Sequence, residues 1–223
     1  MKLSKVALIA AVAALACAAF AQGGGQGRRG GGGNPYAPMT LVGREEVQKE
    51  LNITDDQKTK LTELRTSIRT KMTEARQAAG QDRTAQAEAS KKITEEGQKA
   101  LSEILTAEQT KRLRELQIQW TGTSIVLTDK EVQASLSITD EQKEKLADLQ
   151  KRQQTANAEL RTKVQSQEID QAAANEARKK NATILEEEIG KVLTDAQKTK
   201  LTDLGGKPLA KPAAPVGRGG GGN

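Results

Sequence analysis

The chain is poor in the side chains that carry most protein chemistry. Its 223 residues include no histidine, one cysteine (Cys17), and one each of tryptophan, tyrosine and phenylalanine. Histidine and cysteine are the ligands that structural zinc sites use most, so direct zinc binding is disfavoured. The sequence also lacks a phosphate-binding glycine loop between a strand and a helix, and a nucleophilic serine elbow. We therefore expect no cofactor and no enzymatic activity.

The first 21 residues have the composition of a secretory signal peptide. Lys2 and Lys5 form a basic start, an alanine-rich apolar run follows, and Ala19-Phe20-Ala21 fits a cleavage site. The apolar run is short for a transmembrane helix. We expect residues 1–21 to be removed and the protein to be exported to the periplasm.

Cys17 leaves an alternative open. Ala14-Leu15-Ala16-Cys17 loosely resembles a lipoprotein box, in which the cysteine is lipidated. With cleavage after Ala21 the mature chain has no cysteine and no disulfide. With processing at Cys17 the protein carries a lipid anchor, and mass spectrometry distinguishes the two.

The two ends are of low complexity. We expect residues 22–40, rich in glycine and arginine, and residues 207–223, rich in proline and glycine, to be disordered. Residues 41–206 hold 28 Lys/Arg and all 29 Asp/Glu, a net charge of −1, so the basic character belongs to the ends. Because the protein is expected to be exported, we expect no nucleic-acid partner, and the ends are expected to solubilise the chain. Weak contact with an anionic envelope surface is the alternative.

One motif, an apolar residue followed by Thr-x-x-Gln, occurs four times. A threonine three residues before a glutamine is typical of a capping box, in which each side chain satisfies a backbone N–H of the other residue at a helix start. We expect each motif to begin a helix, with its apolar residue pointing into a core. The motif residues are Ile53, Thr54 and Gln57; Leu105, Thr106 and Gln109; Ile138, Thr139 and Gln142; and Leu193, Thr194 and Gln197.

The four motifs belong to an internal duplication. Residues from Val47 onward match residues 85 positions later, and from Asp82 onward the offset becomes 88, so the second copy has three extra residues. We expect a helix to absorb this insertion, which is close to one turn. The predicted units are residues 41–120 and 121–206, joined by Thr121–Ser124, each with about four helices. Gly205-Gly206 is expected to end the second.

The predicted long helices are only thinly apolar. Leu61, Leu64, Ile68, Met72, Ala75 and Ala79 recur at three- and four-residue spacing. Such a stripe buries a coiled-coil-like seam between two helices and not a thick core. The predicted fold is therefore all-α: two tandem units of elongated, thin helical hairpins.

These motifs, bracketing long charged helices behind a signal peptide, resemble the LTXXQ-motif family, the Spy/CpxP-like periplasmic stress proteins. The resemblance covers about residues 44–206, once per copy. It implies an all-α fold and an ATP-independent chaperone or envelope-stress protein that holds unfolding clients. Family members of this kind form antiparallel dimers. Two units on one chain suggest an intrachain pseudo-dimer, with a homodimer as the alternative.

The sequence thus favours a client-binding protein over two other classes. Lys58, Lys60, Arg65 and Arg69 are the candidate client-contact residues, because cations attract acidic segments and speed encounter. The first alternative is a non-catalytic envelope adaptor or regulator that binds one fixed protein partner. The second is a passive, lipid-anchored spacer.

Overall fold

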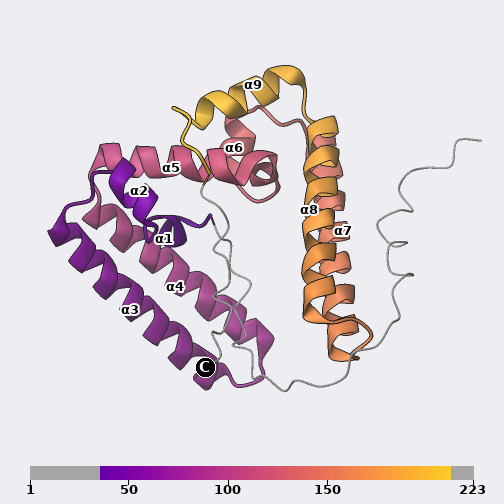
Figure 1. Ribbon diagram of the computed structural model, residues 1–223, viewed down its shortest axis with the longest axis horizontal. Coiled ribbons are helices and arrows are strands. Elements are labelled where there is room, and N and C mark those ends of the chain that lie inside the picture. Colours follow the sequence, from indigo (N-terminus) through magenta and orange to yellow (C-terminus); the bar gives the residue numbers. More distant parts are fainter. Residues whose placement is uncertain (1–35, 212–223) are drawn as a thin grey trace, which may run out of the picture. The chain divides into compact units, whose positions relative to one another are not determined.

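The computed structural model describes residues 36–211, and the regular structure within that range is helical throughout (Figure 1). It comprises nine α-helices and one 3₁₀ segment. The expectation of an all-α protein is therefore confirmed. The predicted signal peptide, Cys17 and the outer parts of both low-complexity ends lie outside the described residues.

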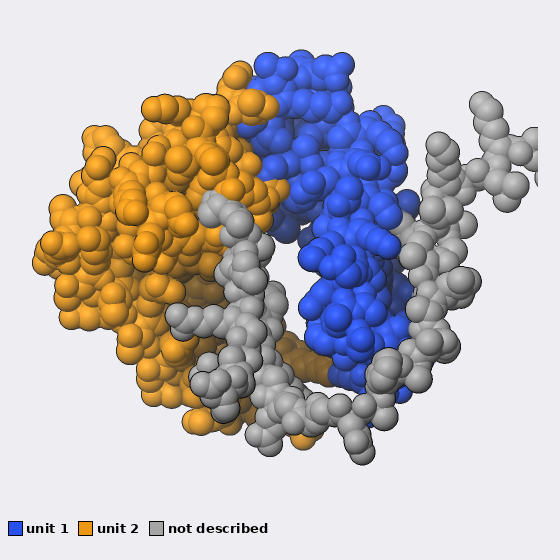
Figure 2. Space-filling model, in the orientation of Figure 1, with its two compact units in different colours: residues 1–31, 122–201 blue, residues 32–121, 202–223 orange. Residues whose placement is uncertain are grey.

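The chain divides into two compact units (Figure 2). Of the described residues, unit 2 contains 36–121 and 202–211, and unit 1 contains 122–201. The chain thus leaves unit 2 after Thr121 and re-enters it at Thr202. Residues 202–206, which we assigned to the second predicted unit, group with the first half of the chain instead.

Unit 2 is built on a helical hairpin. Helices α3 and α4 lie side by side and are joined by a turn at Gly80, whose φ of +54° is readily adopted by glycine (Figure 1). Asp82 begins the second helix, and its carboxylate accepts from the N–H groups of Thr84 and Ala85 at 2.9 and 3.0 Å. The helices of this unit are α1 (Pro38–Leu41), α2 (Glu45–Glu50), α3 (Asp55–Ala79), α4 (Arg83–Ile104) and α5 (Ala107–Thr121).

Unit 1 repeats this plan with a longer hairpin turn. It contains η3 (Gly122–Leu127), α6 (Lys130–Ser135), α7 (Asp140–Gln165), α8 (Gln171–Val192) and most of α9 (Asp195–Leu204). The expected placement of the three extra residues was wrong in part. Helix α7 is one residue longer than α3, and the turn that follows is two residues longer, with Gln167 at φ +59°. The loop takes most of the insertion because a full extra helical turn would lengthen one side of the hairpin alone.

Three predicted irregular segments are more ordered than expected. Within residues 22–40, Pro38 opens α1, where its fixed φ suits a first helical turn, and Leu41 at the end of this helix is fully buried. Within 121–124, Thr121 ends α5 and the rest begins η3. Within 207–223, residues 207–211 lie along α5 through several hydrogen bonds. Composition missed these segments because a few anchoring contacts, not overall apolar content, hold them.

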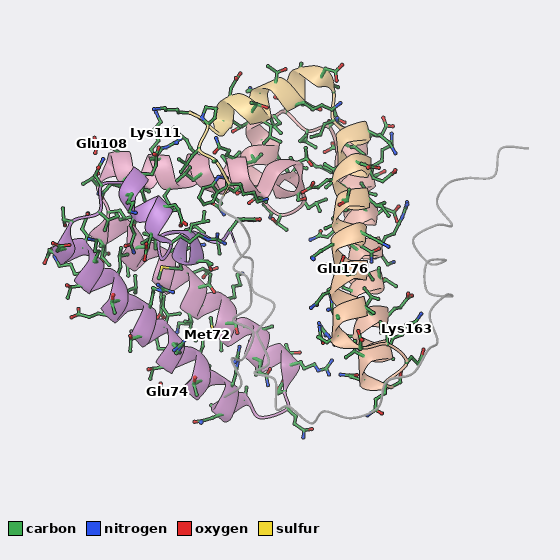
Figure 3. The ribbon with its side chains drawn as sticks, viewed as in Figure 1. Met72, Glu74, Glu108, Lys111, Lys163 and Glu176 are labelled. Atoms are coloured by element: carbon green, nitrogen blue, oxygen red, sulfur yellow. The ribbon has the colours of Figure 1, made fainter. Side chains whose placement is uncertain are left out.

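The main hydrophobic core of unit 2 lies at the end of the hairpin where the motifs are. It includes Leu51, Ile53, Leu61, Leu116 and Trp120. Further along the hairpin the apolar stripe of α3 is only half-buried, at Leu64, Ile68, Met72, Ala75 and Ala79. Figure 3 shows Met72 on the side of α3 toward α4 and Glu74 on the outer side. The hairpin therefore has a buried hydrophobic core at its base and only a half-buried seam further out, as the narrow stripe predicts.

Two helical glycines give opposite expectations for alanine substitution. A Cβ on Gly190 in α8 would meet no atom within 4 Å, whereas one on Gly97 in α4 would lie 2.6 Å from Cδ1 of Ile68. Gly190→Ala is expected to raise the free energy of unfolding by about 0.5–1 kcal/mol through helix propensity. Gly97→Ala should give less than this or destabilise, because Ile68 must move. Urea denaturation followed by circular dichroism checks the order, and a larger gain at Gly97 would contradict the packing.

Candidate functional site

All four Thr-x-x-Gln motifs form reciprocal capping boxes. They begin α3, α5, α7 and α9. In each, the threonine Oγ1 accepts from the glutamine N–H at 3.2 Å, and the glutamine Oε1 accepts from the threonine N–H at 2.9–3.1 Å. Each box satisfies N–H groups that a helix start otherwise leaves without a partner.

The motifs also bind each other in pairs. In unit 2, Gln57 Nε2 donates to Gln109 Oε1 at 2.7 Å, and Gln109 Nε2 donates to Gln57 Oε1 at 3.1 Å. Each amide nitrogen also donates to a backbone carbonyl: Gln57 to Ile104 at 2.9 Å and Gln109 to Leu51 at 3.0 Å. We call this pair of side chains a glutamine clasp. It joins the start of α3 to the start of α5, across 52 residues of sequence.

Unit 1 contains a second clasp with the same connections. Gln142 and Gln197 exchange hydrogen bonds of 2.8 and 3.0 Å. Their amide nitrogens also donate to the carbonyls of Val192 and Leu136, which correspond in the duplication to Ile104 and Leu51. The clasp is therefore a property of the repeated motif and not of one local environment.

The clasp explains why glutamine occupies the fourth position of the motif. Each amide oxygen accepts two hydrogen bonds and each amide nitrogen donates two, so the full capacity of the side chain is used. Gln57 is 9% exposed, so unmet donors or acceptors there would be costly. Glutamate caps a helix start equally well but has no donor for the partner or the carbonyl.

The apolar residue of each motif adds a hydrophobic contact to the clasp. Ile53, Leu105, Ile138 and Leu193 are 4–6% exposed. The turn before α3 and the turn before α7 match as well, because Asn52 and Ser137 both adopt φ +51°. The motif is thus a complete closure for the base of a hairpin: a turn, a cap, a buried apolar group and half of a clasp.

The candidate client-contact residues are divided between two sides of α3. Lys58, Arg65 and Arg69 share one side by their spacing of seven and four residues, and Lys60 lies opposite. Lys58 and Lys60 pair with Asp55 and Asp56 at 2.8 Å. The structure therefore brings three of the four together, near the base of the hairpin.

The acidic residues at the helix starts are exposed but electrostatically engaged. A hydrogen bond from Lys58 and its charge lower the pKa of Asp55, and Lys143 lowers the pKa of Asp140 in the same way. The pKa of Glu108 is lowered by its own backbone N–H and by the Thr106 side chain. These groups suit the positive end of a helix.

These shifts set the expected sign of the pH dependence. A carboxylate with a folded-state pKa below its unfolded value of 3.8, as for Asp55 and Asp140, stabilises the fold above that value. This contribution is lost as the pH falls through the folded-state pKa. The double variant Asp55→Asn/Asp140→Asn is expected to lose less stability than the parent between about pH 5 and pH 2.

Urea denaturation of the parent and the double variant at about pH 5 and about pH 2, in low salt and in about 1 M NaCl, measures the difference between their losses of stability. Salt should shrink it, because both carboxylates are fully exposed and screening acts on exposed charges. Equal pH dependence in parent and variant would contradict the assignment.

The hairpins extend beyond the clasps as arms, which we define as residues 62–100 in unit 2 and 147–188 in unit 1. In the first arm the seam between the helices is half-buried and is bordered by charges, including an exposed ion pair of Lys71 with Glu96 at 2.7 Å. In the second, Leu160, Val164, Ile184 and Leu185 are half-buried. The arms therefore present partly accessible apolar groups among charges of both signs.

The described residues offer no other site of evident chemistry. Within 36–211 no group of acidic, histidine or cysteine side chains is placed to hold a metal ion, and Glu188 of the run Glu186–Glu188 pairs with Lys191. No helix in that range is long and apolar enough to cross a membrane. The hollow on α3 lined by Thr62, Thr66, Ser67 and Thr70 is shallow and exposed.

Sequence reasoning missed two features of this structure. The capping boxes follow from a three-residue spacing, but the pairing of the glutamines requires knowing which helix starts meet. The docking of residues 207–211 on α5 was hidden by their proline- and glycine-rich context. The one available signal was Leu209, an isolated apolar residue between Pro208 and Ala210.

Comparison with known families gives one match. Residues 22–113 match a family model described as a domain of unknown function (DUF4890), which covers less than half of the chain. No curated protein and no solved structure matches the chain. The matched stretch runs through α1–α4 and ends within α5, so it includes both motifs of the first clasp.

Proposed function

We propose that the protein is an exported, ATP-independent chaperone of the periplasm, or an envelope-stress protein, that holds unfolding clients on the arms of its hairpins. Support comes from the difference between the well-packed base and the half-buried arm of each hairpin. The clasp and the core fix the base, while the arms keep an apolar seam that is only half-buried. The resemblance to the LTXXQ-motif family points to the same class of function.

The half-buried seam is the observation that carries this proposal. Leu64, Ile68 and Met72 have part of their apolar surface in contact with water. An unfolded chain exposes leucine, valine and phenylalanine, and covering either surface is favourable in proportion to the area removed from water. Because each accessible patch is small, the contacts are weak and unselective, which suits a protein that must bind many sequences and release them without nucleotide.

Charges beside the seam extend the range of clients. Lys58, Arg65 and Arg69 lie on one side of α3. Cations on a helix raise the rate of encounter with acidic segments and act weakly once contact is made. We expect their substitution to slow capture in low salt while leaving capture in high salt nearly unchanged.

Two units on one chain allow the protein to act as an intrachain pseudo-dimer. The second clasp and second arm repeat the first, so a single chain holds two potential client surfaces. The mass of the purified chain, measured by light scattering, tests this part of the proposal. A monomer supports it, and a stable homodimer at micromolar concentration would replace it.

Light scattering of a chemically unfolded client, without nucleotide and at rising ratios of this protein, tests the proposed function. We expect suppression of aggregation near stoichiometric ratios. Met72→Gln should weaken suppression, whereas its matched control Glu74→Gln, on the outer side of the same helix, should not (Figure 3). Circular dichroism confirms that both variants remain helical.

No suppression by a helical, folded sample would sink the chaperone proposal. It would favour the alternative of an envelope adaptor or regulator with one fixed partner. Charge reversal at a few sites would abolish binding to such a partner, while a chaperone would lose activity gradually.

A further inference from the structure

A short extended segment follows α9 and lies along α5 of unit 2. We call residues 205–211 the strap. It begins with two glycines, and the second is the more restricted: Gly206 has φ +63°, and a Cβ there would collide with the Glu115 carboxylate, whereas a Cβ on Gly205 would lie 3.2 Å from Cβ of Gln119, a tight contact that a small shift relieves. The two glycines let the chain turn sharply out of α9 and approach α5 closely (Figure 1).

Side chains of α5 bind the main chain of the strap. The carbonyl of Lys207 accepts from Arg112 Nη2 at 2.8 Å and from Gln119 Nε2 at 3.2 Å. The N–H of Leu209 donates to Gln119 Oε1 at 2.9 Å, and its carbonyl accepts from Trp120 Nε1 at 3.1 Å. These contacts involve alternate residues of the strap and groups that every peptide has.

Two strap side chains, two positions apart, also make contacts. Leu209 is half-buried and packs against the hydrophobic core of unit 2. Lys211 donates to the carbonyl of Trp120 at 2.9 Å and lies 4.4 Å from the centre of the Tyr36 ring, a cation–π distance. Pro208 and Ala210 are exposed. This alternation is that of an extended peptide with one face toward its receptor.

Of the α5 side chains that bind the strap, Arg112 is also held by ion pairs to residues outside the strap. The side chain of Arg112 is 15% exposed and is held by Glu50 at 2.7 Å and Glu115 at 2.9 Å. Gln119 and Trp120 follow seven and eight positions later, so the three side chains share one face of α5. A helix face with a held guanidinium, an amide and an indole donor in line is suited to bind a peptide backbone.

We propose that this face of α5 is a binding site for an extended peptide segment of another protein, with an aliphatic residue followed two positions later by lysine or arginine. The strap occupies the site in cis and competes with that segment. Four of its last five residues are exposed, so little apolar surface is uncovered when it detaches. When the strap detaches, water can bind the α5 donors that it leaves, so detachment leaves no buried polar group without a partner. This inference is independent of client binding on the arms.

The full chain with Leu209→Asp tests the site, because this change removes the strap's apolar anchor. The probe is a fluorescein-labelled peptide of the strap sequence, Gly-Gly-Lys-Pro-Leu-Ala-Lys. We expect the variant to bind it about tenfold more tightly than the parent, in which the cis strap has a high effective concentration. The sole tryptophan, Trp120, is a built-in reporter: its emission should shift to the red in the variant and return when the peptide binds.

Three controls make the test decisive. A peptide with aspartate in place of leucine should not bind. Gln119→Ala in the Leu209→Asp background should weaken binding about tenfold, because it removes three hydrogen bonds to the main chain, at Gly205, Lys207 and Leu209. A probe of unrelated sequence with the same spacing, Ser-Gly-Lys-Ser-Ile-Ser-Arg, should bind within about tenfold of the strap peptide, because the main chain supplies most contacts.

Two results would overturn the inference. The first is a Leu209→Asp variant with unchanged circular dichroism that binds neither probe. The second is a parent chain that dimerises with rising concentration, in a manner abolished by Leu209→Asp, which would assign the site to the strap of a second copy.

Discussion

Replacement of Trp120 by alanine is expected to lower the free energy of unfolding of unit 2 by about 3–5 kcal/mol, the usual cost of deleting a buried tryptophan. Trp120 is 2% exposed and packs in the same core as Leu41, Leu51 and Leu116. Its indole also holds the strap through Leu209. In a thin all-helical unit one large side chain supplies much of the apolar area, and its removal leaves a cavity that few neighbours can fill.

Trp120→Phe is the matched control. It keeps most of the ring and loses the Nε1 donor, so we expect a cost of about 1–2 kcal/mol. Urea denaturation followed by circular dichroism measures both variants, since fluorescence of the parent cannot be compared once its only tryptophan is gone. If Trp120→Ala lowers the free energy of unfolding no more than Trp120→Phe does, the packing of the Trp120 ring does not stabilise the core.

The clasp gives the second large effect. Gln57→Ala is expected to cost about 2–4 kcal/mol, because it removes the glutamine half of the capping box, deprives the Ile104 carbonyl of its Gln57 donor and takes one hydrogen bond from each end of the Gln109 amide. The neighbouring exposed substitution Lys58→Ala should change stability by less than about 0.5 kcal/mol. A double-mutant cycle with Gln109→Ala should show a coupling of about 0.5–3 kcal/mol.

Gln57→Glu separates the clasp from the cap. Glutamate retains the capping hydrogen bond to Thr54 but offers no donor to Ile104 or Gln109, so we expect a cost of about 1–3 kcal/mol at neutral pH. The acceptors around it raise the pKa of the introduced carboxyl, so stability should recover as the pH falls and the group regains a donor. A neutral effect at pH 7 would mean that the motif is only a cap.

The contrast between cap and clasp shows what the sequence could predict. A capping box joins residues three apart, so Thr54 and Gln57 already define it in the linear sequence. The clasp joins Gln57 to a residue 52 positions away, and nothing in either motif states that the two helix starts meet. The duplication offers a hint, since the motif occurs twice per copy, but repetition alone does not distinguish two caps from one joined pair.

The ends of the folded region were harder to predict for a different reason. The strap has the composition of a linker, and Leu209 is its one sizeable apolar residue among glycine, proline and lysine. Its order comes from donors and acceptors on α5, chiefly Gln119 and Trp120. The apolar content of a segment does not reveal whether another part of the chain offers donors and acceptors that bind it.

The three-residue insertion of the second copy was placed in a helix, whereas most of it lies in the turn after α7. The geometry of the hairpin decides between the two, and the sequence does not state that geometry.

We propose that the clasped bases hold arms whose half-buried seams bind unfolded clients. Hydrogen–deuterium exchange of the full chain, with and without a chemically unfolded client, tests it most directly. We predict that the client slows exchange in residues 62–100 and 147–188 and leaves exchange at the clasps unchanged. Protection confined to α5, or none at all while the client remains soluble, would contradict client binding on the arms.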